Sequence, residues 1–161
     1  GRFTMKQGFT LAELIIVMGM LAVLTVLTTV NLLRPQHQAS TLAAVATLIA
    51  DLRQQQLKAM LGDTEGSGTP ASYGVFLNTN NYTLFRGSTY AAGNPSNFSV
   101  SLESPIQTTT AFPNSQIVFQ AGSGEVAGFT SGSNTISVTN IYSSTISTLT
   151  INRYGTTETV D

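Results

Sequence analysis

The sequence predicts an α+β protein in which a long N-terminal helix, with a membrane half and an amphipathic half, packs on an antiparallel β-sheet head. Three patterns predict this class: an early apolar run, a stretch with helical spacing of apolar residues, and a remainder in which apolar residues alternate. The 161 residues amount to about one domain. We expect a leader at residues 1–8, a transmembrane helix at 9–34, an amphipathic half-helix at 35–62 and a β-rich globular head at 63–161.

Residues 14–33 form a run of twenty residues without a charged side chain. About 20 helical residues, at about 1.5 Å each, match the hydrocarbon core of a bilayer, which is about 30 Å thick. Arg2 and Lys6 precede the run, which favours a cytoplasmic N-terminus and a head outside the cytoplasm. The small residues of a signal-peptide cleavage site do not follow the run. We therefore expect a single-pass protein of the cytoplasmic membrane.

Glu13 is the one charged residue between Phe9 and Leu33. A carboxylate in a membrane helix is costly, so we expect it to have a partner, and the sequence offers none nearby. Cleavage after the small residue Gly8 would give Phe9 an α-amino group one helical turn away, with a reference pKa of about 7.7 to 8.0. Glu13 could then neutralise the amine of its own chain or that of a neighbouring chain. The alternative is an interfacial glutamate in a plain signal anchor.

Two adjacent motifs carry a family resemblance, Lys6-Gln7-Gly8 and Phe9-Thr10-Leu11-Ala12-Glu13-Leu14. Together with the apolar run they resemble the N-terminus of a type IV prepilin or pseudopilin. The resemblance implies a pilin-like fold, cleavage after Gly8 by a prepilin peptidase, N-methylation of Phe9, and packing into a filament core through Glu13. It also implies other pilins or pseudopilins, an inner-membrane assembly platform and membrane lipid as partners. Ala12 departs mildly from the family, which more often has a larger aliphatic residue there.

The segment after the apolar run has the spacing of an amphipathic helix. Pro35 is expected to kink the helix, because it cannot donate the backbone hydrogen bond to residue 31. Apolar residues then recur near helical spacing, at Leu42, Val45, Leu48, Ile49, Leu52, Leu57 and Met60. Gly62 is a candidate helix C-cap, and residues 63–70 have the composition of a loop.

From Tyr73 onward the apolar period changes to two, which is typical of strands. Residues 73–77 and 82–86 flank a polar turn at 78–81 and predict a hairpin. Further short alternating runs lie near Phe98, Ile117, Ile136 and Leu149. We expect six to eight short antiparallel strands, with threonine and serine on their outward faces.

The composition argues against an enzyme and against a bound cofactor or metal. The chain has no cysteine and one histidine, which excludes disulfides and leaves no ordinary zinc site. His37 precedes the head and has no catalytic partner in the sequence pattern, so we expect it to be interfacial or solvated. The stretch Asp63-Thr64-Glu65-Gly66 lacks the further ligands of a calcium loop.

The expected function is that of a structural subunit, a minor pilin or pseudopilin of a type IV pilus or type II secretion system filament. The hairpin at residues 73–87 and the segment 149–155 weakly resemble the heads of minor pseudopilins of type II secretion and of related minor type IV pilins. The net charge is −1, and Arg86 and Arg153 are the only basic side chains after Lys58, which disfavours nucleic acid as a partner. The alternatives are a DNA-binding competence minor pilin, a major adhesive pilin and a plain signal-anchored envelope protein.

Overall fold

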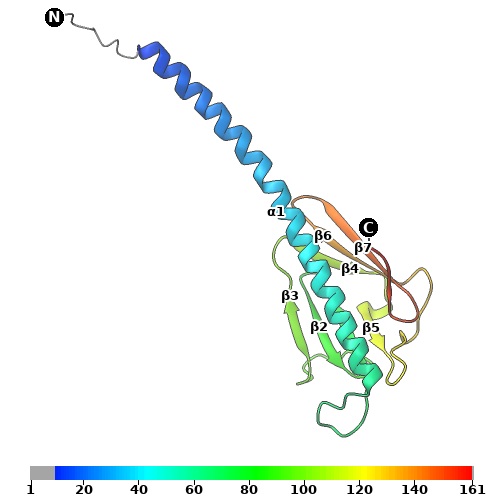
Figure 1. Ribbon diagram of the computed structural model, residues 1–161. Helices are drawn as coiled ribbons and strands as arrows, with labels where there is room; N and C mark the ends of the chain where they lie inside the picture. Colours follow the sequence, from blue (N-terminus) through cyan, green and yellow to red (C-terminus); the bar gives the residue numbers. More distant parts are fainter. Residues whose placement is uncertain (1–9, 161) are drawn as a thin grey trace, which may run out of the picture. The chain divides into compact units, whose positions relative to one another are not determined.

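The computed structural model describes residues 10–160, without the side chains of residues 27–38, 159 and 160. It contains one α-helix, α1 (Leu11–Leu61), followed by eight strands (Figure 1). The chain divides into two compact units, residues 1–36 and residues 37–161. Each unit is described by itself below.

The strands of the second unit form two four-stranded sheets. One sheet has the order β3-β2-β1-β5 and the other has the order β4-β6-β7-β8, and every paired neighbour is antiparallel. The strands are β1 (Tyr73–Leu77), β2 (Asn81–Arg86), β3 (Phe98–Ser101), β4 (Ile106–Thr110), β5 (Gln116–Phe119), β6 (Thr135–Asn140), β7 (Thr145–Ile151) and β8 (Thr157–Val160). A short 3-10 helix, η1 (Pro113–Ser115), precedes β5.

The predicted hairpin is present as β1 and β2. Tyr73 pairs with Arg86 and Leu77 pairs with Tyr82, and the amide of Asn78 donates to the carbonyl of Asn81 across the turn. Glycine is required at position 74, where a Cβ atom would lie 2.5 Å from the carbonyl oxygen of Ile117 on β5. This close approach lets β5 pair along the other edge of β1.

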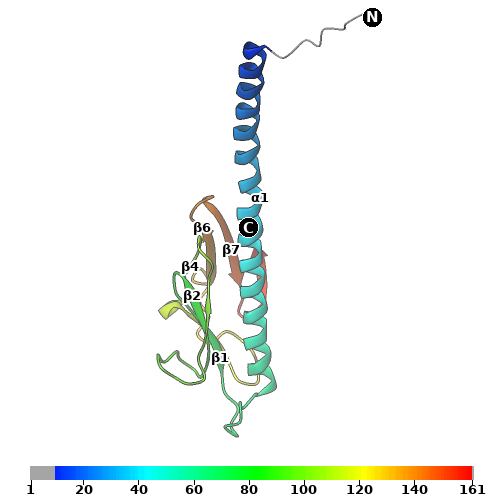
Figure 2. The same cartoon turned by 90° about the vertical axis from the view of Figure 1, so that its left-hand side faces the viewer.

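Residues 39–61 of α1 cross both sheets and lie against one side of them (Figures 1 and 2). One stripe of this segment is buried at helical spacing, formed by Thr41, Val45, Leu48, Leu52, Gln55 and Ala59. The stripe packs against buried residues of both sheets in a single hydrophobic core. The predicted stripe is therefore wrong at Leu42, Leu57 and Met60, which are at least half exposed. The prediction assumed that apolar residues occupy the buried face of the helix, whereas the polar residues Thr41 and Gln55 occupy two of its buried positions.

The fold class predicted from the sequence is wrong. The head has two antiparallel sheets rather than one, and only the stretch at residues 39–61 packs on it as a helix with described side chains. The other helical stretch with described side chains, residues 11–26, belongs to the first unit. Within the described part of the chain, no helix combines the length and the hydropathy needed to cross a membrane. The second sheet was not predicted, because the alternation of apolar and polar residues indicates which face of a strand is buried and does not indicate which strands pair with it.

Candidate functional site

The first turn of α1 is closed by a reciprocal set of hydrogen bonds between Thr10 and Glu13. The backbone amide and the hydroxyl of Thr10 donate to Oε2 of Glu13 at 3.0 and 2.9 Å, and the amide of Glu13 donates to the hydroxyl of Thr10 at 3.3 Å. The carbonyl of Thr10 accepts the amide of Leu14 at 3.2 Å. This is a capping box, which satisfies amides that lack a partner at a helix start and places a carboxylate at the positive end of the helix dipole.

The capping box corrects the expectation that Glu13 has no partner nearby in sequence. Thr10 is that partner, and the pattern threonine-x-x-glutamate before an apolar run is the signal that could have revealed it. Oε1 of Glu13 accepts no hydrogen bond from a described residue. Gly8 and Phe9, the predicted processing residues, lie outside the described residues.

Behind the capping box, the large apolar side chains of residues 14–26 are exposed on every side of the helix. Their exposed fractions range from 49% at Val17 to 66% at Met18 and Val26. Gly19 interrupts this surface, and the space beside it is open, because a Cβ atom added there would have no described atom within 4 Å. A shallow hollow over Gly19 is bordered by Ile16, Met20 and Val23. This unit therefore presents an apolar surface that its own described residues leave uncovered.

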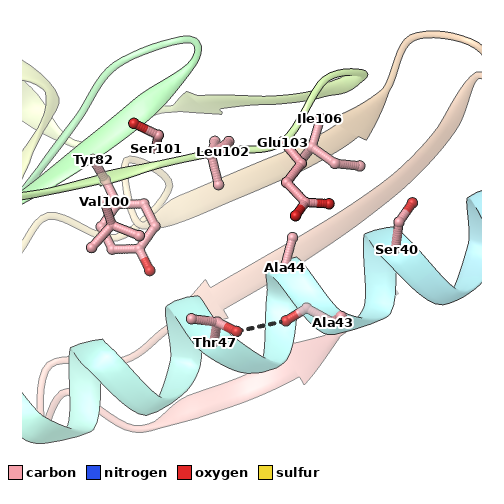
Figure 3. A pocket seen from close by; sticks show the side chains of 10 residues that line it. All are labelled: Ser40, Ala43, Ala44, Thr47, Tyr82, Val100, Ser101, Leu102, Glu103 and Ile106. Carbon is pink, nitrogen blue, oxygen red and sulfur yellow. Dashed lines mark hydrogen bonds between the residues drawn. The ribbon is translucent and has the colours of Figure 1, made fainter.

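In the second unit, a cavity of about 240 Å³ lies between α1 and the strands β2, β3 and β4 (Figure 3). Figure 3 shows the Glu103 carboxylate turned toward the helix, near Ala44, while the hydroxyl of Thr47 donates to the carbonyl of Ala43 at 2.9 Å. The remaining walls are apolar or carry hydroxyl groups. No histidine or lysine is among the residues that line this cavity. Apart from the Glu103 carboxylate and the phenol of Tyr82, the lining therefore holds no side chain that acts as a general acid or base.

A polar contact next to that cavity ties the helix to the first sheet. The hydroxyl of Tyr82 on β2 donates to Oδ2 of Asp51 on α1 at 2.5 Å. Burial of the ring and the neighbouring Asp51 carboxylate both raise the pKa of Tyr82 above its ordinary value. Tyr82 therefore stays protonated and remains the donor throughout the physiological pH range.

The remaining residues considered from the sequence are engaged in structural contacts. Glu65 Oε1 accepts a hydrogen bond from Lys58 at 2.8 Å, and Asp63 Oδ1 accepts the amide of Glu65 at 2.9 Å. Arg86 donates to the hydroxyl of Ser67 and to the carbonyl of Thr69. Arg153 pairs with Glu125 at 3.1 Å. The side chain of His37 lies outside those that the structure describes.

No protein-family model, curated protein or solved structure matches the chain. The family resemblance therefore depends on sequence patterns alone, namely the residues around the capping box, the apolar run behind it and the weaker likeness of segments 73–87 and 149–155. The sites that the structure adds are Thr10, the Asp51–Tyr82 contact and the buried amide of Gln55. Gln55 gave no signal in the sequence, because a glutamine beside two others reads as a solvated helix face.

Proposed function

We propose that the chain is a structural subunit of a type IV pilus or type II secretion system filament, either a minor pilin or a pseudopilin. The observation that carries the proposal is the helical stretch at residues 14–26, whose large apolar side chains are at least 49% exposed. Burial of apolar surface contributes about 25 cal/mol per Å². A helix that is apolar on all sides is ordinarily buried in a protein core or a membrane. Helices of neighbouring subunits would supply that cover.

The assembly step follows from the start of the helix. In the proposal, prepilin peptidase cuts between Gly8 and Phe9, and Phe9 is then N-methylated. The new amine provides a cation for Glu13, whose Oε1 has no partner among the described residues. When the helix enters an apolar filament core, pairing with the amine of a neighbouring chain compensates two charges that are costly to bury separately. Assembly would thus be favoured by charge pairing as well as by apolar contact.

The proposal includes a location in the inner membrane before assembly, with the head outside the cytoplasm. The uncharged sequence run at residues 14–33 and the basic residues Arg2 and Lys6 support it. An assembly platform in that membrane and other pilins or pseudopilins are the proposed partners. The proposed role is structural rather than enzymatic, as the composition with one histidine and no cysteine predicts.

The processing step is tested by intact-mass measurement of the protein extracted from membranes of a host with an active prepilin peptidase. We expect a chain that starts at Phe9 and carries one added methyl group. A Gly8→Ala variant, in which the small flexible residue at the cut is lost, should accumulate with the leader attached. Retention of residues 1–8 in the unchanged chain would contradict the proposal and would favour a plain signal-anchored envelope protein.

A further inference from the structure

A second cavity of the unit at residues 37–161, of about 310 Å³, lies between α1 and the first sheet. We call it the Gln55 cavity. Its walls come from the helix, the loop that follows it, β1, β2, the β2–β3 connection and β3. They include Asp51, Gln55, Lys58, Leu84, Ser96 and Phe98. Its volume is at the lower end of the range for small-molecule sites, about 300 to 1,000 Å³.

Gln55 is the unusual residue of this cavity. Its side chain is only 3% exposed and lies in the buried stripe of α1, between Leu52 and Ala59. Its amide forms no hydrogen bond with a described residue, and it is not among the fully buried unpaired groups of the described residues, which are Nε of Arg86 and Oδ1 of Asn97. The amide is therefore accessible from the cavity that Gln55 lines. An amide that opens onto a cavity can bond water or a ligand hydroxyl group there. The Gln55 amide thus offers one acceptor and two donor hydrogens to the cavity.

Two further groups offer unused contacts in the same cavity. Oδ2 of Asp51 accepts the hydrogen bond from the Tyr82 hydroxyl, and Oδ1 has no partner among the described residues. The ring of Phe98 is 65% exposed, although it lies on strand β3 directly opposite Leu84. The cavity thus combines a fixed carboxylate oxygen, a buried amide and an open aromatic face.

The charges around the cavity select the class of ligand. Lys58 and Glu65 neutralise one another at 2.8 Å, so Asp51 is the remaining charge of the lining. An anion would meet the Asp51 carboxylate, which repels it. A metal ion would need several acidic or histidine ligands, and the described residues form no such group. A neutral ligand rich in hydroxyl groups fits, because it can donate to Asp51 and both donate to and accept from an amide.

We propose that the Gln55 cavity binds one neutral pyranose unit of a saccharide. A ligand hydroxyl donates to Oδ1 of Asp51, neighbouring hydroxyls bond the amide of Gln55, and the C–H face of the ring packs on Phe98. Ser96 also lines the cavity, and in the proposal its hydroxyl group supplies a further contact. This role of the head is independent of filament assembly.

The test is ligand-observed NMR and calorimetry on the full chain in a detergent without a sugar headgroup. The probes are methyl glucoside, methyl galactoside, methyl mannoside and N-acetylglucosamine, with acetate and methylammonium as ionic comparators. We expect millimolar or tighter binding of at least one neutral sugar and no binding of the two ions. Absence of sugar binding, or binding of an ion in its place, overturns the proposal.

Two variants assign the binding to the cavity. Gln55→Leu should weaken sugar binding by about tenfold or more, because an amide that bonds the ligand is lost. It should also raise the melting temperature, since a leucine suits the buried position better than an amide without a partner. Phe98→Ala changes an exposed ring and should weaken binding while the fold stays intact. Gln120→Leu, at an exposed position outside the cavity, is the matched control.

Sugar affinity unchanged in Gln55→Leu would contradict the proposal. A lowered melting temperature in that variant would also contradict it, since the glutamine would then be serving the fold. A loss of affinity in Gln120→Leu equal to that in Gln55→Leu would place the sugar elsewhere and would likewise overturn it.

Discussion

The two helical stretches of α1 with described side chains bury their apolar residues to very different extents. Residues 14–26 expose every large apolar side chain by 49% or more, whereas Val45, Leu48 and Leu52 are at most 4% exposed. The carboxylates of the two stretches, Glu13 and Asp51, also differ in how far along the chain their partners lie. Glu13 bonds only to Thr10 within its own turn, while Asp51 reaches Tyr82, 31 residues away on a strand. The second stretch thus has a stripe that its own chain buries, and the described side chains of the first stretch form no such stripe.

The comparison is tested most strongly by truncating one leucine in each stretch. Leu48→Ala leaves a cavity in the shared core of both sheets and should lower the free energy of unfolding by about 2 to 5 kcal/mol. Leu21→Ala, at a side chain 58% exposed, should change it by less than about 0.5 kcal/mol. Urea unfolding followed by tyrosine fluorescence measures this, since all five tyrosines lie in residues 73–154. Equal losses in the two variants would contradict the comparison.

Glycine substitutions should have opposite effects in the two units. Gly74→Ala forces a Cβ atom to 2.5 Å from the carbonyl of Ile117 and from the ring of Phe85, and should destabilise the head by about 1 to 3 kcal/mol. Gly19→Ala meets open space in a helix and should stabilise it by about 0.5 to 1 kcal/mol. Amide hydrogen exchange resolves the two sites separately. Faster exchange around residue 19 in Gly19→Ala would show that glycine is needed there for another reason.

The contact between Asp51 and Tyr82 makes the stability of the head depend on pH. The folded-state pKa of Tyr82 is raised above the ordinary value of 10.0. The stabilisation is therefore fully present below about pH 10 and is lost as the pH rises toward the folded-state pKa. Tyr82→Phe should lower stability by about 1 kcal/mol near neutral pH and should flatten the decline above pH 10. An unchanged alkaline slope in urea midpoints measured from pH 7 to 11 would contradict this assignment.

Sequence patterns anticipated the local elements better than their assembly. The hairpin of β1 and β2 could be predicted, because alternation and a polar turn are local signals. The pairing of β4 with β6 could not be predicted, because 24 residues separate Thr110 from Thr135. The alternation of apolar residues within a strand does not indicate which other strand pairs with it. The buried positions of Thr41 and Gln55 were missed for a similar reason. Only the packed sheets decide which stripe of an amphipathic helix faces the core.

The candidate assembly site was predicted in part. Glu13 was noticed because it is the one charge in an apolar stretch, but its bond to Thr10 is a local cap that charge counting overlooks. The structure thus gives Glu13 a role in its own chain, and the proposed role in assembly must be separated from it.

The most direct measurement compares how two variants, Glu13→Gln and Thr10→Val, are incorporated into sheared filaments. Glutamine keeps the capping box and removes the charge, whereas valine removes the cap and keeps the charge. Thr10→Val should weaken the helix start by about 1 kcal/mol. Each variant is scored by its amount in filaments relative to its amount in membranes, with cleavage after Gly8 checked by mass. We predict cleaved but poorly incorporated Glu13→Gln and nearly normal Thr10→Val. Normal incorporation of Glu13→Gln with failure of Thr10→Val would show that Glu13 acts only as a cap.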